Sequence, residues 1–362
     1  MTRVLVVDDS ALMRKFLGRL FEAEGGFEVA TARDGEEALA MIGAFRPDVV
    51  TLDVEMPKMD GLACLDRIML EHPCPVVMVS ALTEHGADET LEALEMGAVD
   101  FVTKPDGTIS LHAEEFAPVI LERVRVAAGI RLRRSTRLAD RLRFRSGKCL
   151  DRRSTRSTAK RPLEVPPALG GETMVLVGAS TGGPPALDTL LSALPADFGW
   201  PVLVAQHMPQ TFTASFARRL DGLCNLSVVE VGKPMPIEPG RVYIGRGDAD
   251  MLVARRGGRS MVMPAPASAA YRWHPSVDRL VQSAMQHCSP SELVGILMTG
   301  MGNDGAAAMT ELRAAGGHTI AEAEETAVVW GMPGDLVRRG GASDVVPLPQ
   351  ISERLLELGP WR

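Results

Sequence analysis

The segment MVLVGASTGG, Met174 to Gly183, decides the fold of the C-terminal half of the chain. The apolar residues Met174–Val177 indicate a buried strand, which runs directly into a serine flanked by glycines. Glycine permits the sharp backbone turn needed there, and its small size lets a substrate approach. Ser180 is therefore a candidate nucleophile for acyl transfer, a reaction that also needs a base and an acid that orients the base.

Outward from this segment, short apolar strands alternate with amphipathic helices from Thr173 onward. We expect strands at Met174–Val177, Pro201–Ala205, Ser227–Glu230, Val242–Ile244, Leu293–Leu297 and His318–Ala321. We expect helices at Pro184–Ala193, Thr213–Leu220, Val277–His287 and Ala306–Ala315. The pattern predicts a doubly wound, Rossmann-like parallel sheet, in which ligands bind beyond the carboxyl ends of the strands.

Two residues can complete a nucleophilic site with Ser180. His207 ends the apolar run PVLVAQHMP, and Asp304 lies in the glycine-rich loop of ILMTGMGNDGA, which follows another strand. His274, in a loop, remains a second candidate base, whereas His287 and His318 fall within or next to regular elements. The glycine loop could instead hold a phosphate or nucleotide, but its acid and its lack of a P-loop lysine disfavour that.

The N-terminal residues repeat the α/β alternation. Strands are expected at Val4–Val7, Phe27–Thr31, Val49–Leu52, Val76–Val79 and Val99–Val102, with helices that include Ala11–Glu24 and Glu36–Ala44. This order predicts a flavodoxin-like parallel sheet. Asp8, Asp9, Asp53, Ser80 and Lys104 then fall at one edge, where three carboxylates favour a divalent cation such as Mg²⁺. The alternative for any single Asp is a helix N-cap.

The blocks VLVVDDS, TLDVEMPKMDG, VVMVSA and DFVTKP occur in this order within residues 1 to about 125. This half resembles the response-regulator receiver family. The resemblance implies that Asp53 accepts a phosphoryl group from a partner chemotaxis histidine kinase. It also implies that Asp8, Asp9, Asp53 and the backbone carbonyl of Glu55 hold Mg²⁺.

The same resemblance assigns three sensing residues near the phosphoryl group. Ser80 and Lys104 would contact it, and Phe101 stands at the family's aromatic switch position. The family also implies a cis peptide bond between Lys104 and Pro105, which proline makes accessible.

The C-terminal half carries GASTGGPPAL, QHMPQTFTASFARRL, PGRVYIGRGD, HPSVDRL, LMTGMGNDGA and ETAVVWGMPG. It resembles the chemotaxis receptor methylesterase (CheB) family. The resemblance implies Ser180 as nucleophile, His207 as general base and Asp304 as its orienter, with the backbone N–H groups of Thr181 and Met301 as oxyanion hole. No cofactor is implied for ester hydrolysis.

The implied activity is a phosphorylation-activated hydrolysis of glutamate γ-methyl esters on chemoreceptors, with deamidation of receptor glutamines as a second activity. The unphosphorylated receiver is expected to cover the cleft. Arg246, Asp250, His274 and Glu322 (in IAEAEE, 320–325) depart from the family pattern, and we expect them at receptor-binding or interdomain surfaces. Rival interpretations are a second domain that only binds a partner, and a regulator that acts on nucleic acid.

Charge is unevenly distributed. Residues 131–161 contain thirteen Lys or Arg and two Asp, a net charge of +11 that leaves −18 for the remainder. We therefore predict a receiver domain at 1–127, a basic linker at 128–170 and a catalytic domain at 171–362. We expect the linker to be a solvated connection, and its charge suggests the hypothesis that it also contacts acidic receptor tails or anionic membrane. We recognise no nucleic-acid module in it.

Composition indicates where the protein works. The five cysteines, Cys64, Cys74, Cys149, Cys224 and Cys288, form no CxxC pair, which favours a reducing cytoplasm and disfavours a structural zinc site. No apolar run reaches the ~18 residues of a membrane span, and the N-terminus does not resemble a signal peptide. We expect a cytoplasmic protein that associates peripherally with receptor arrays.

Overall fold

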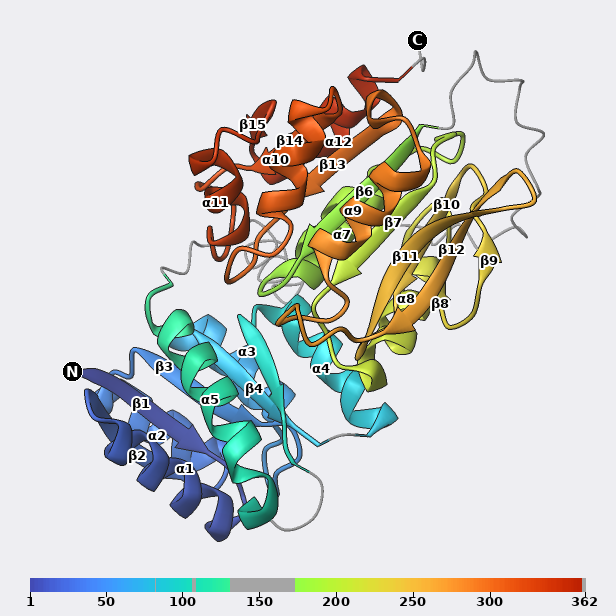
Figure 1. Cartoon of the computed structure of the whole chain (residues 1–362). Helices are drawn as coiled ribbons and strands as arrows, with labels where there is room; N and C mark the ends of the chain where they lie inside the picture. Colours follow the sequence, from blue (N-terminus) through green and yellow to red (C-terminus); the bar gives the residue numbers. More distant parts are fainter. Residues whose placement is uncertain (82, 106–108, 131–172, 360–362) are drawn as a thin grey trace, which may run out of the picture.

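The computed structural model describes residues 1–81, 83–105, 109–130 and 173–359, which form two α/β units (Figure 1). The α/β parallel-sheet class predicted for both halves is confirmed. Residues 131–172, with the basic segment and Cys149, lie outside the described residues, so the three predicted domain limits stay predictions. In the described part of the chain, no helix combines the length and apolarity needed to cross a bilayer.

Strands and helices alternate strictly in the N-terminal unit. They are β1 (Thr2–Val7), α1 (Ala11–Glu24), β2 (Phe27–Ala32), α2 (Gly35–Phe45), β3 (Val49–Asp53), α3 (Gly61–Glu71), β4 (Val76–Ser80), α4 (Glu84–Met96), β5 (Asp100–Thr103) and α5 (Ile109–Ala128). All strands are parallel, in the order β2-β1-β3-β4-β5. The chain reverses its direction of travel between β1 and β3, which opens a crevice at their carboxyl ends.

Both faces of this sheet are buried, as the apolar strands predict. Val4 and Val6 of β1 point into the cluster formed with α1 and α5, whereas Leu5 and Val7 point into the cluster on the α2, α3 and α4 side. Successive side chains of β1 point to opposite faces of the sheet, so this strand contributes apolar residues to the core on each face.

The C-terminal unit begins with the strand that opened the sequence analysis. Its elements are β6 (Met174–Ala179), α7 (Gly183–Ser192), β7 (Val202–Gln206), α8 (Gln210–Leu223), β8 (Ser227–Val231), β9 (Met235–Pro236), β10 (Arg241–Gly245), β11 (Ala249–Arg256), β12 (Arg259–Pro266), α9 (Val277–His287), the 3-10 turn η1 (Pro290–Glu292), β13 (Leu293–Leu297), α10 (Ala306–Ala314), β14 (His318–Glu322), α11 (Met332–Arg338), β15 (Asp344–Val346) and α12 (Leu348–Glu357). Seven strands form one parallel sheet in the order β15-β14-β13-β6-β7-β10-β8.

The position of β6 explains where a site can form. From β6 the chain passes to β7, β8 and β10 on one side, and then crosses to β13, β14 and β15 on the other. The switch point lies between β6 and β13, at whose carboxyl ends Ser180 and the glycine-rich loop stand.

A three-stranded antiparallel sheet, β11-β12-β9, was not predicted. Its hairpin turns at Gly257 and Gly258, whose φ angles of 56° and 79° suit a tight two-residue turn. The sequence feature that indicates this hairpin is the Gly-Gly pair between two segments in which apolar and polar residues alternate.

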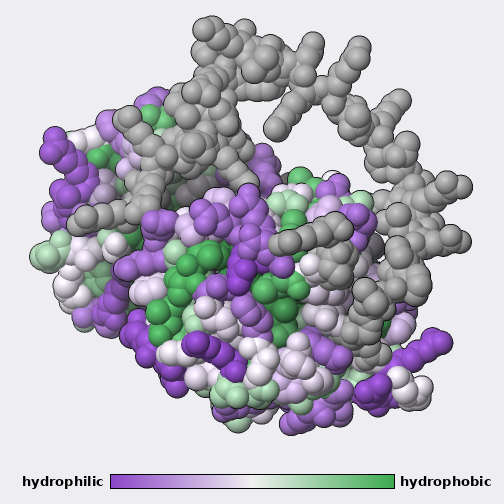
Figure 2. Space-filling view, turned by 90° about the horizontal axis from the view of Figure 1, so that it is seen from above, coloured by the Kyte–Doolittle hydropathy of each residue, from purple (hydrophilic) through white to green (hydrophobic). Residues whose placement is uncertain are grey.

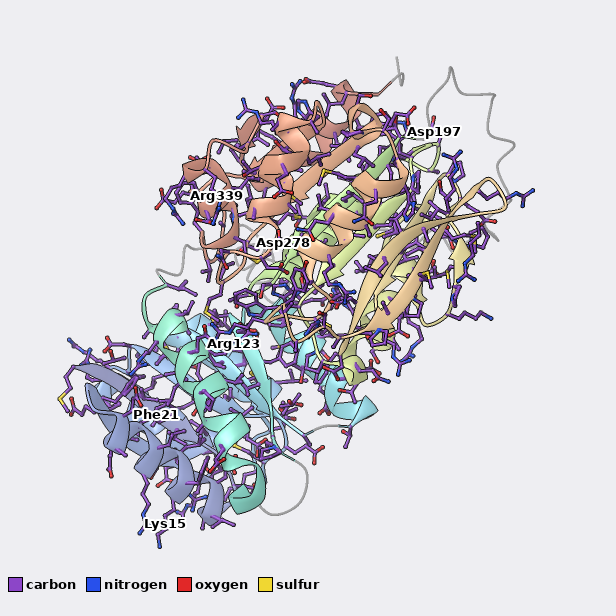
Figure 3. The ribbon with its side chains drawn as sticks, in the orientation of Figure 1. Lys15, Phe21, Arg123, Asp197, Asp278 and Arg339 are labelled. Carbon is purple, nitrogen blue, oxygen red and sulfur yellow. The ribbon has the colours of Figure 1, made fainter. Side chains whose placement is uncertain are left out.

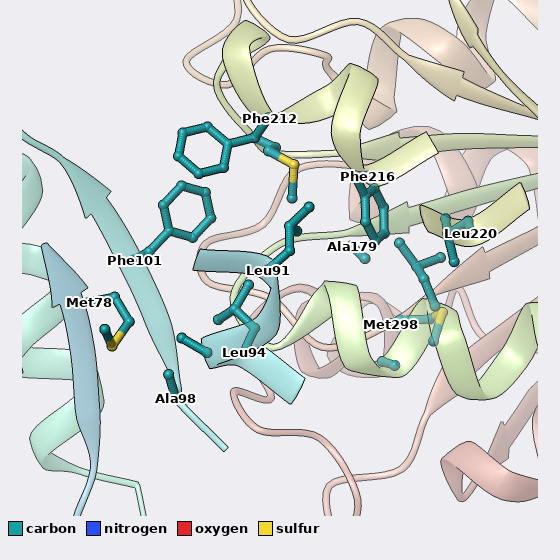
Figure 4. Close-up of a cluster of buried hydrophobic side chains, with 14 of the residues drawn as sticks. Met78, Leu91, Leu94, Ala98, Phe101, Ala179, Phe212, Phe216, Leu220 and Met298 are labelled. Carbon is teal, nitrogen blue, oxygen red and sulfur yellow. The ribbon is translucent and has the colours of Figure 1, made fainter. Parts of the chain in front are cut away.

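The two units share one apolar cluster (Figure 4). Leu91 and Leu94 of α4 and Phe101 of β5 belong to the same buried cluster as Phe212 and Phe216 of α8. The Phe101 and Phe212 ring centroids are 4.5 Å apart. On the face seen in Figure 2, by contrast, apolar residues form separate patches among hydrophilic side chains. The α4–β5 face of the N-terminal unit is thus covered by the C-terminal unit.

Candidate functional site

Ser180 directly follows β6 and is buried. Its backbone N–H donates to the carbonyl of Thr299 (3.0 Å), and its carbonyl accepts from Nε2 of Gln206 (3.0 Å). The turn continues through Gly182 at φ 75°, where an added Cβ would lie 2.6 Å from Cβ of Val328. Both the positive φ angle and the close approach of Val328 therefore require glycine at position 182, in the turn that presents Ser180.

His207 follows β7, and its Nε2 lies 2.8 Å from Oδ2 of Asp304, in the loop between β13 and α10. Asp304 also accepts from the backbone N–H groups of Val277 (2.7 Å) and Asp278 (3.1 Å) and from Oγ of Ser276 (3.1 Å). Burial alone would raise the pKa of Asp304, but the hydrogen bonds from His207 and the backbone outweigh it and hold that pKa below its usual range. An ionised carboxylate therefore orients the imidazole.

The groups that a nucleophilic reaction needs are free to act. Among the described residues, Nδ1 of His207 has no hydrogen-bond partner, although it is buried. The backbone N–H groups of Thr181 and Met301 likewise donate to no described group. A free ring nitrogen next to a serine turn, with two unpaired donors, can deprotonate a nucleophile and stabilise an oxyanion.

The other candidate base has a different partner. Nδ1 of His274 lies 2.9 Å from Oδ1 of Asp250, and Nε2 of His318 lies 2.6 Å from Oδ2 of Asp344. It is therefore His207, and not His274, that is joined to Asp304.

A second site lies at the carboxyl ends of β1 and β3. Carboxylate oxygens of Asp8, Asp9 and Asp53 lie within 4.8 Å of one another. Nζ of Lys104 is 2.7 Å from Oδ2 of Asp53 and 3.0 Å from Oδ2 of Asp8. Burial raises the pKa of Asp53 to about 6, against the opposing effect of Lys104. Three carboxylates clustered in this way fit a divalent cation that takes oxygen ligands.

An open cavity adjoins these carboxylates. Its lining includes Asp9, Asp53, Glu55, Ser80 and Lys104. Oγ of Ser80 donates to the carbonyl of Gly86 (3.2 Å) at the start of α4. Phe101 is absent from this lining, because its ring packs on Phe212 of the other unit. The predicted sensing residues are thus divided between the cavity and the contact between units.

The predicted cis bond at Lys104–Pro105 is wrong. Among the described residues, the cis peptide bond is His274–Pro275. The trans form of an X–Pro bond is favoured by about 0.5–1 kcal/mol. With it, Nζ of Lys104 already reaches both Asp8 and Asp53, so nothing in this pocket requires the cis form.

Comparison with known proteins assigns a family to each half of the chain. Family models match the response regulator receiver domain over residues 4–114 and CheB methylesterase over residues 175–355. The chain is 55% identical, over 99% of its length and 98% of the relative's, to protein-glutamate methylesterase/protein-glutamine glutaminase 2 of Rhodopseudomonas palustris (strain BisB18). It is 54% identical, over 98% and 95%, to protein-glutamate methylesterase/protein-glutamine glutaminase 3 of Rhodospirillum rubrum.

The chain belongs to the CheB methylesterase family. The crystal structure of the Thermotoga maritima CheB methylesterase catalytic domain matches with a TM-score of 0.50 and 36% identity, covering 52% of this chain and 100% of that one. The family resemblances found in the sequence are confirmed.

In this CheB-family chain, two of the four departures from the family pattern are buried. Asp250 accepts from the backbone N–H of Ser276 (2.8 Å) and from His274, and it pairs with Arg279. Glu322 accepts from the backbone N–H of Thr299 (2.8 Å). These two side chains therefore hold the catalytic unit together internally, and the expectation of surface positions is wrong for them.

The receiver contacts the residue that follows Ser180. Oγ1 of Thr181 donates to the carboxylate of Asp100, the first residue of β5, and accepts from Arg123 of α5 (2.7 Å). Arg123 lies at the boundary between the units (Figure 3). At the rim, Arg272 binds Glu122 of α5 (2.8 Å). The CheB-family receiver thus meets the candidate oxyanion residue directly.

Sequence reasoning missed three contributors to this region. Asp100 lies in the DFVTKP block but received no role there, and Arg123 lies in no quoted block, because the partner of both residues comes from the other unit. Trp273 stacks on His207, with ring centroids 5.7 Å apart and planes 4° from parallel. An aromatic residue directly before the HPSVD stretch was the available signal.

Proposed function

We propose that this chain is a phosphorylation-activated serine hydrolase that converts glutamate γ-methyl esters of chemoreceptors to glutamate and methanol, and that also deamidates receptor glutamines. The names of its relatives, protein-glutamate methylesterase/protein-glutamine glutaminase, support both activities. The observation that carries the proposal is the 2.8 Å contact between His207 and Asp304, next to the Ser180 turn. Ester and amide share one acyl intermediate and differ in the leaving group.

The proposed reaction uses the free Nδ1 of His207. That nitrogen takes the proton of Ser180 as Oγ attacks the γ-carbonyl carbon, while Asp304 stabilises the imidazolium through Nε2. The N–H groups of Thr181 and Met301 hold the negative oxygen of the tetrahedral intermediate. Collapse expels methanol or ammonia, which takes the proton from His207. Water, deprotonated by His207, then attacks the acyl carbon, and the bond to Oγ of Ser180 breaks as Oγ takes the proton back from His207, which releases glutamate. These steps call for no cofactor.

In the receiver, we propose Asp53 as the acceptor of a phosphoryl group from a chemotaxis histidine kinase. Asp8, Asp9, Asp53 and the carbonyl of Glu55 would hold Mg²⁺, which when bound offsets the charge of the phosphoryl group. Ser80 Oγ, at the cavity wall, would donate to a phosphoryl oxygen. Lys104 would move its ammonium group from the free carboxylates to the phosphoryl group.

Control by the receiver is supported by the contacts at Thr181. With Asp100 and Arg123 bound to its side chain, and Phe101 packed on Phe212, the receiver would cover the approach to Ser180. Phosphorylation would favour an arrangement in which these contacts are broken. We propose a cytoplasmic protein that works at receptor arrays as a peripheral partner and binds no specific nucleic acid.

The deciding experiment measures methanol release from methylated receptor membranes, with and without a small phosphodonor. Wild type is expected to release methanol faster with phosphodonor, and Ser180→Ala is expected to release none. Asp53→Ala is expected to keep the basal rate without stimulation. No release from wild type under either condition would refute the esterase, and stimulation retained by Asp53→Ala would refute the phosphorylation control.

A further inference from the structure

Trp273 is the aromatic side chain that lies flat against the candidate base. Its indole is parallel to the His207 imidazole within 4°, at a centroid distance of 5.7 Å. On the same indole, Cζ2 and Cη2 come within 2.7 Å of the point where a Cβ on Gly302 would stand. Trp273 therefore touches both the base and the loop that carries Met301 and Asp304.

The loop that carries Trp273 is anchored within the catalytic unit. Asp250, whose side chain is fully buried, accepts from Nδ1 of His274 (2.9 Å) and from the N–H of Ser276 (2.8 Å). Oγ of Ser276 in turn donates to Asp304 (3.1 Å). The loop next to the indole is thus held by the same hydrogen-bond network that fixes the acid of the candidate triad, through residues of the catalytic unit.

An indole in this position offers His207 two things that hydrogen bonds do not. It opposes rotation of the imidazole about the Cβ–Cγ bond of His207, because such rotation would break the parallel, offset arrangement that aromatic pairs prefer. It also presents the negative face of its π-system to a ring that becomes positively charged when it takes a proton. Asp304 stabilises that charge only in the plane of the ring, at Nε2.

We propose that Trp273 is a positioning residue for His207, which keeps the imidazole in its reactive orientation and stabilises the imidazolium formed in the transition state. The inference rests on the proposed function of Ser180 and His207. Arg272 extends the arrangement, because its guanidinium lies 5.1 Å from the Trp273 ring centroid while it binds Glu122 of the receiver. The stack therefore has to be tested in the full chain, with phosphodonor present throughout.

The test compares Trp273→Leu, Trp273→Phe and, as a control, Trp200→Leu. Trp200 packs on Phe198, away from the triad. Two rates are measured: methanol release from receptor membranes, and covalent labelling of Ser180 by a fluorophosphonate, which needs an activated serine but no receptor. Thermal unfolding reports whether each variant is folded.

Trp273→Leu is expected to lower kcat and the labelling rate about tenfold, with KM within twofold, because a cation–π contact of this kind stabilises the charged ring by that factor. Trp273→Phe keeps a smaller aromatic face and is expected to recover at least a third of both rates. The control is expected to match wild type.

Equal rates in Trp273→Leu and wild type would overturn the inference, and so would a Phe variant no better than Leu. If the Leu variant does not fold, a folded Phe variant that loses more than tenfold in labelling also overturns it. Failure of the proposed function is distinguishable, since a different substrate would abolish methanol release yet leave the labelling comparison intact.

Discussion

Glu322 is a carboxyl group buried where a neutral group would be more stable. Burial raises its pKa from 4.5 to about 7, and the hydrogen bonds from the Thr299 N–H (2.8 Å) and from Oγ1 of Thr326 (3.0 Å) only partly oppose the rise. Below pH 4.5 the group is protonated in the folded and unfolded chains alike. Between pH 4.5 and 7 the unfolded chain loses its proton first, so the free energy of unfolding falls as pH rises.

The cost follows from the two pKa values. One pKa unit corresponds to about 1.4 kcal/mol, so the folded state is destabilised by about 1 kcal/mol at pH 5 and about 3 kcal/mol at pH 8. Glu322→Gln removes this cost. The glutamine oxygen can accept from Thr299, and its amide can donate to Oγ1 of Thr326, whose own hydrogen can turn to the Ala323 carbonyl (3.3 Å). The exchange therefore leaves no buried group unpaired.

Thermal unfolding of the full chain at pH 5 and pH 8 tests this reasoning. The melting temperature of the catalytic unit should rise by roughly 2–4 °C per kcal/mol, hence by about 6–12 °C at pH 8 and by only a few degrees at pH 5. Glu324→Gln, at an exposed position two residues further on, is the matched control and should change stability by less than about 0.5 kcal/mol at either pH. A gain in Glu322→Gln that is the same at both pH values, or a loss at pH 8, would refute the argument.

Three further outcomes are expected. Asp304→Asn should lower kcat for methanol release by about 10³–10⁴, because the imidazole loses its orienting carboxylate, with a circular dichroism spectrum like that of wild type. Mg²⁺ should raise the melting temperature of the receiver more at pH 7.5 than at pH 5.5, since the cation binds an ionised Asp53 and the pKa of Asp53 is about 6; Asp53→Asn should reduce the effect at pH 7.5. Gly182→Ala should lower the midpoint of urea unfolding by the equivalent of about 1–3 kcal/mol, because its Cβ meets Val328, and a second change of Val328→Ala should restore part of the loss.

The parallel sheets explain how much of the site could be predicted. Ser180, His207 and the loop with Asp304 each follow a strand, and parallel strands bring their carboxyl ends to one edge whatever the lengths of the helices between them. The same rule predicted that Asp8, Asp9 and Asp53 would lie together at one edge of the N-terminal sheet. Strand ends and glycines are local properties, and local properties can be read from a sequence.

The remaining features depend on packing between distant segments. Thr181 and Asp100 are 81 positions apart and belong to different units, so their hydrogen bond exists only once α4 and β5 have docked. Trp273 meets His207 because the buried Asp250 holds its loop against Asp304, and no periodic pattern reports such a contact. A buried glutamate at the end of a strand, Glu322, looks in the sequence like any exposed strand terminus.

The shortness of β5 makes direct coupling between the two sites physically reasonable. Asp100 begins the strand and Lys104 follows it, so the Thr181 contact and the proposed phosphorylation pocket are about 13 Å apart along one extended segment. Phe101 stands between them, packed on Phe212. In the resting chain the Lys104 ammonium is already committed to Asp53 and Asp8, so a phosphoryl group on Asp53 must draw it away from Asp8. A shift at that end of β5 would reach Phe101 through three peptide units and Asp100 through four. It would therefore act on the apolar contact and on the Thr181 hydrogen bonds together.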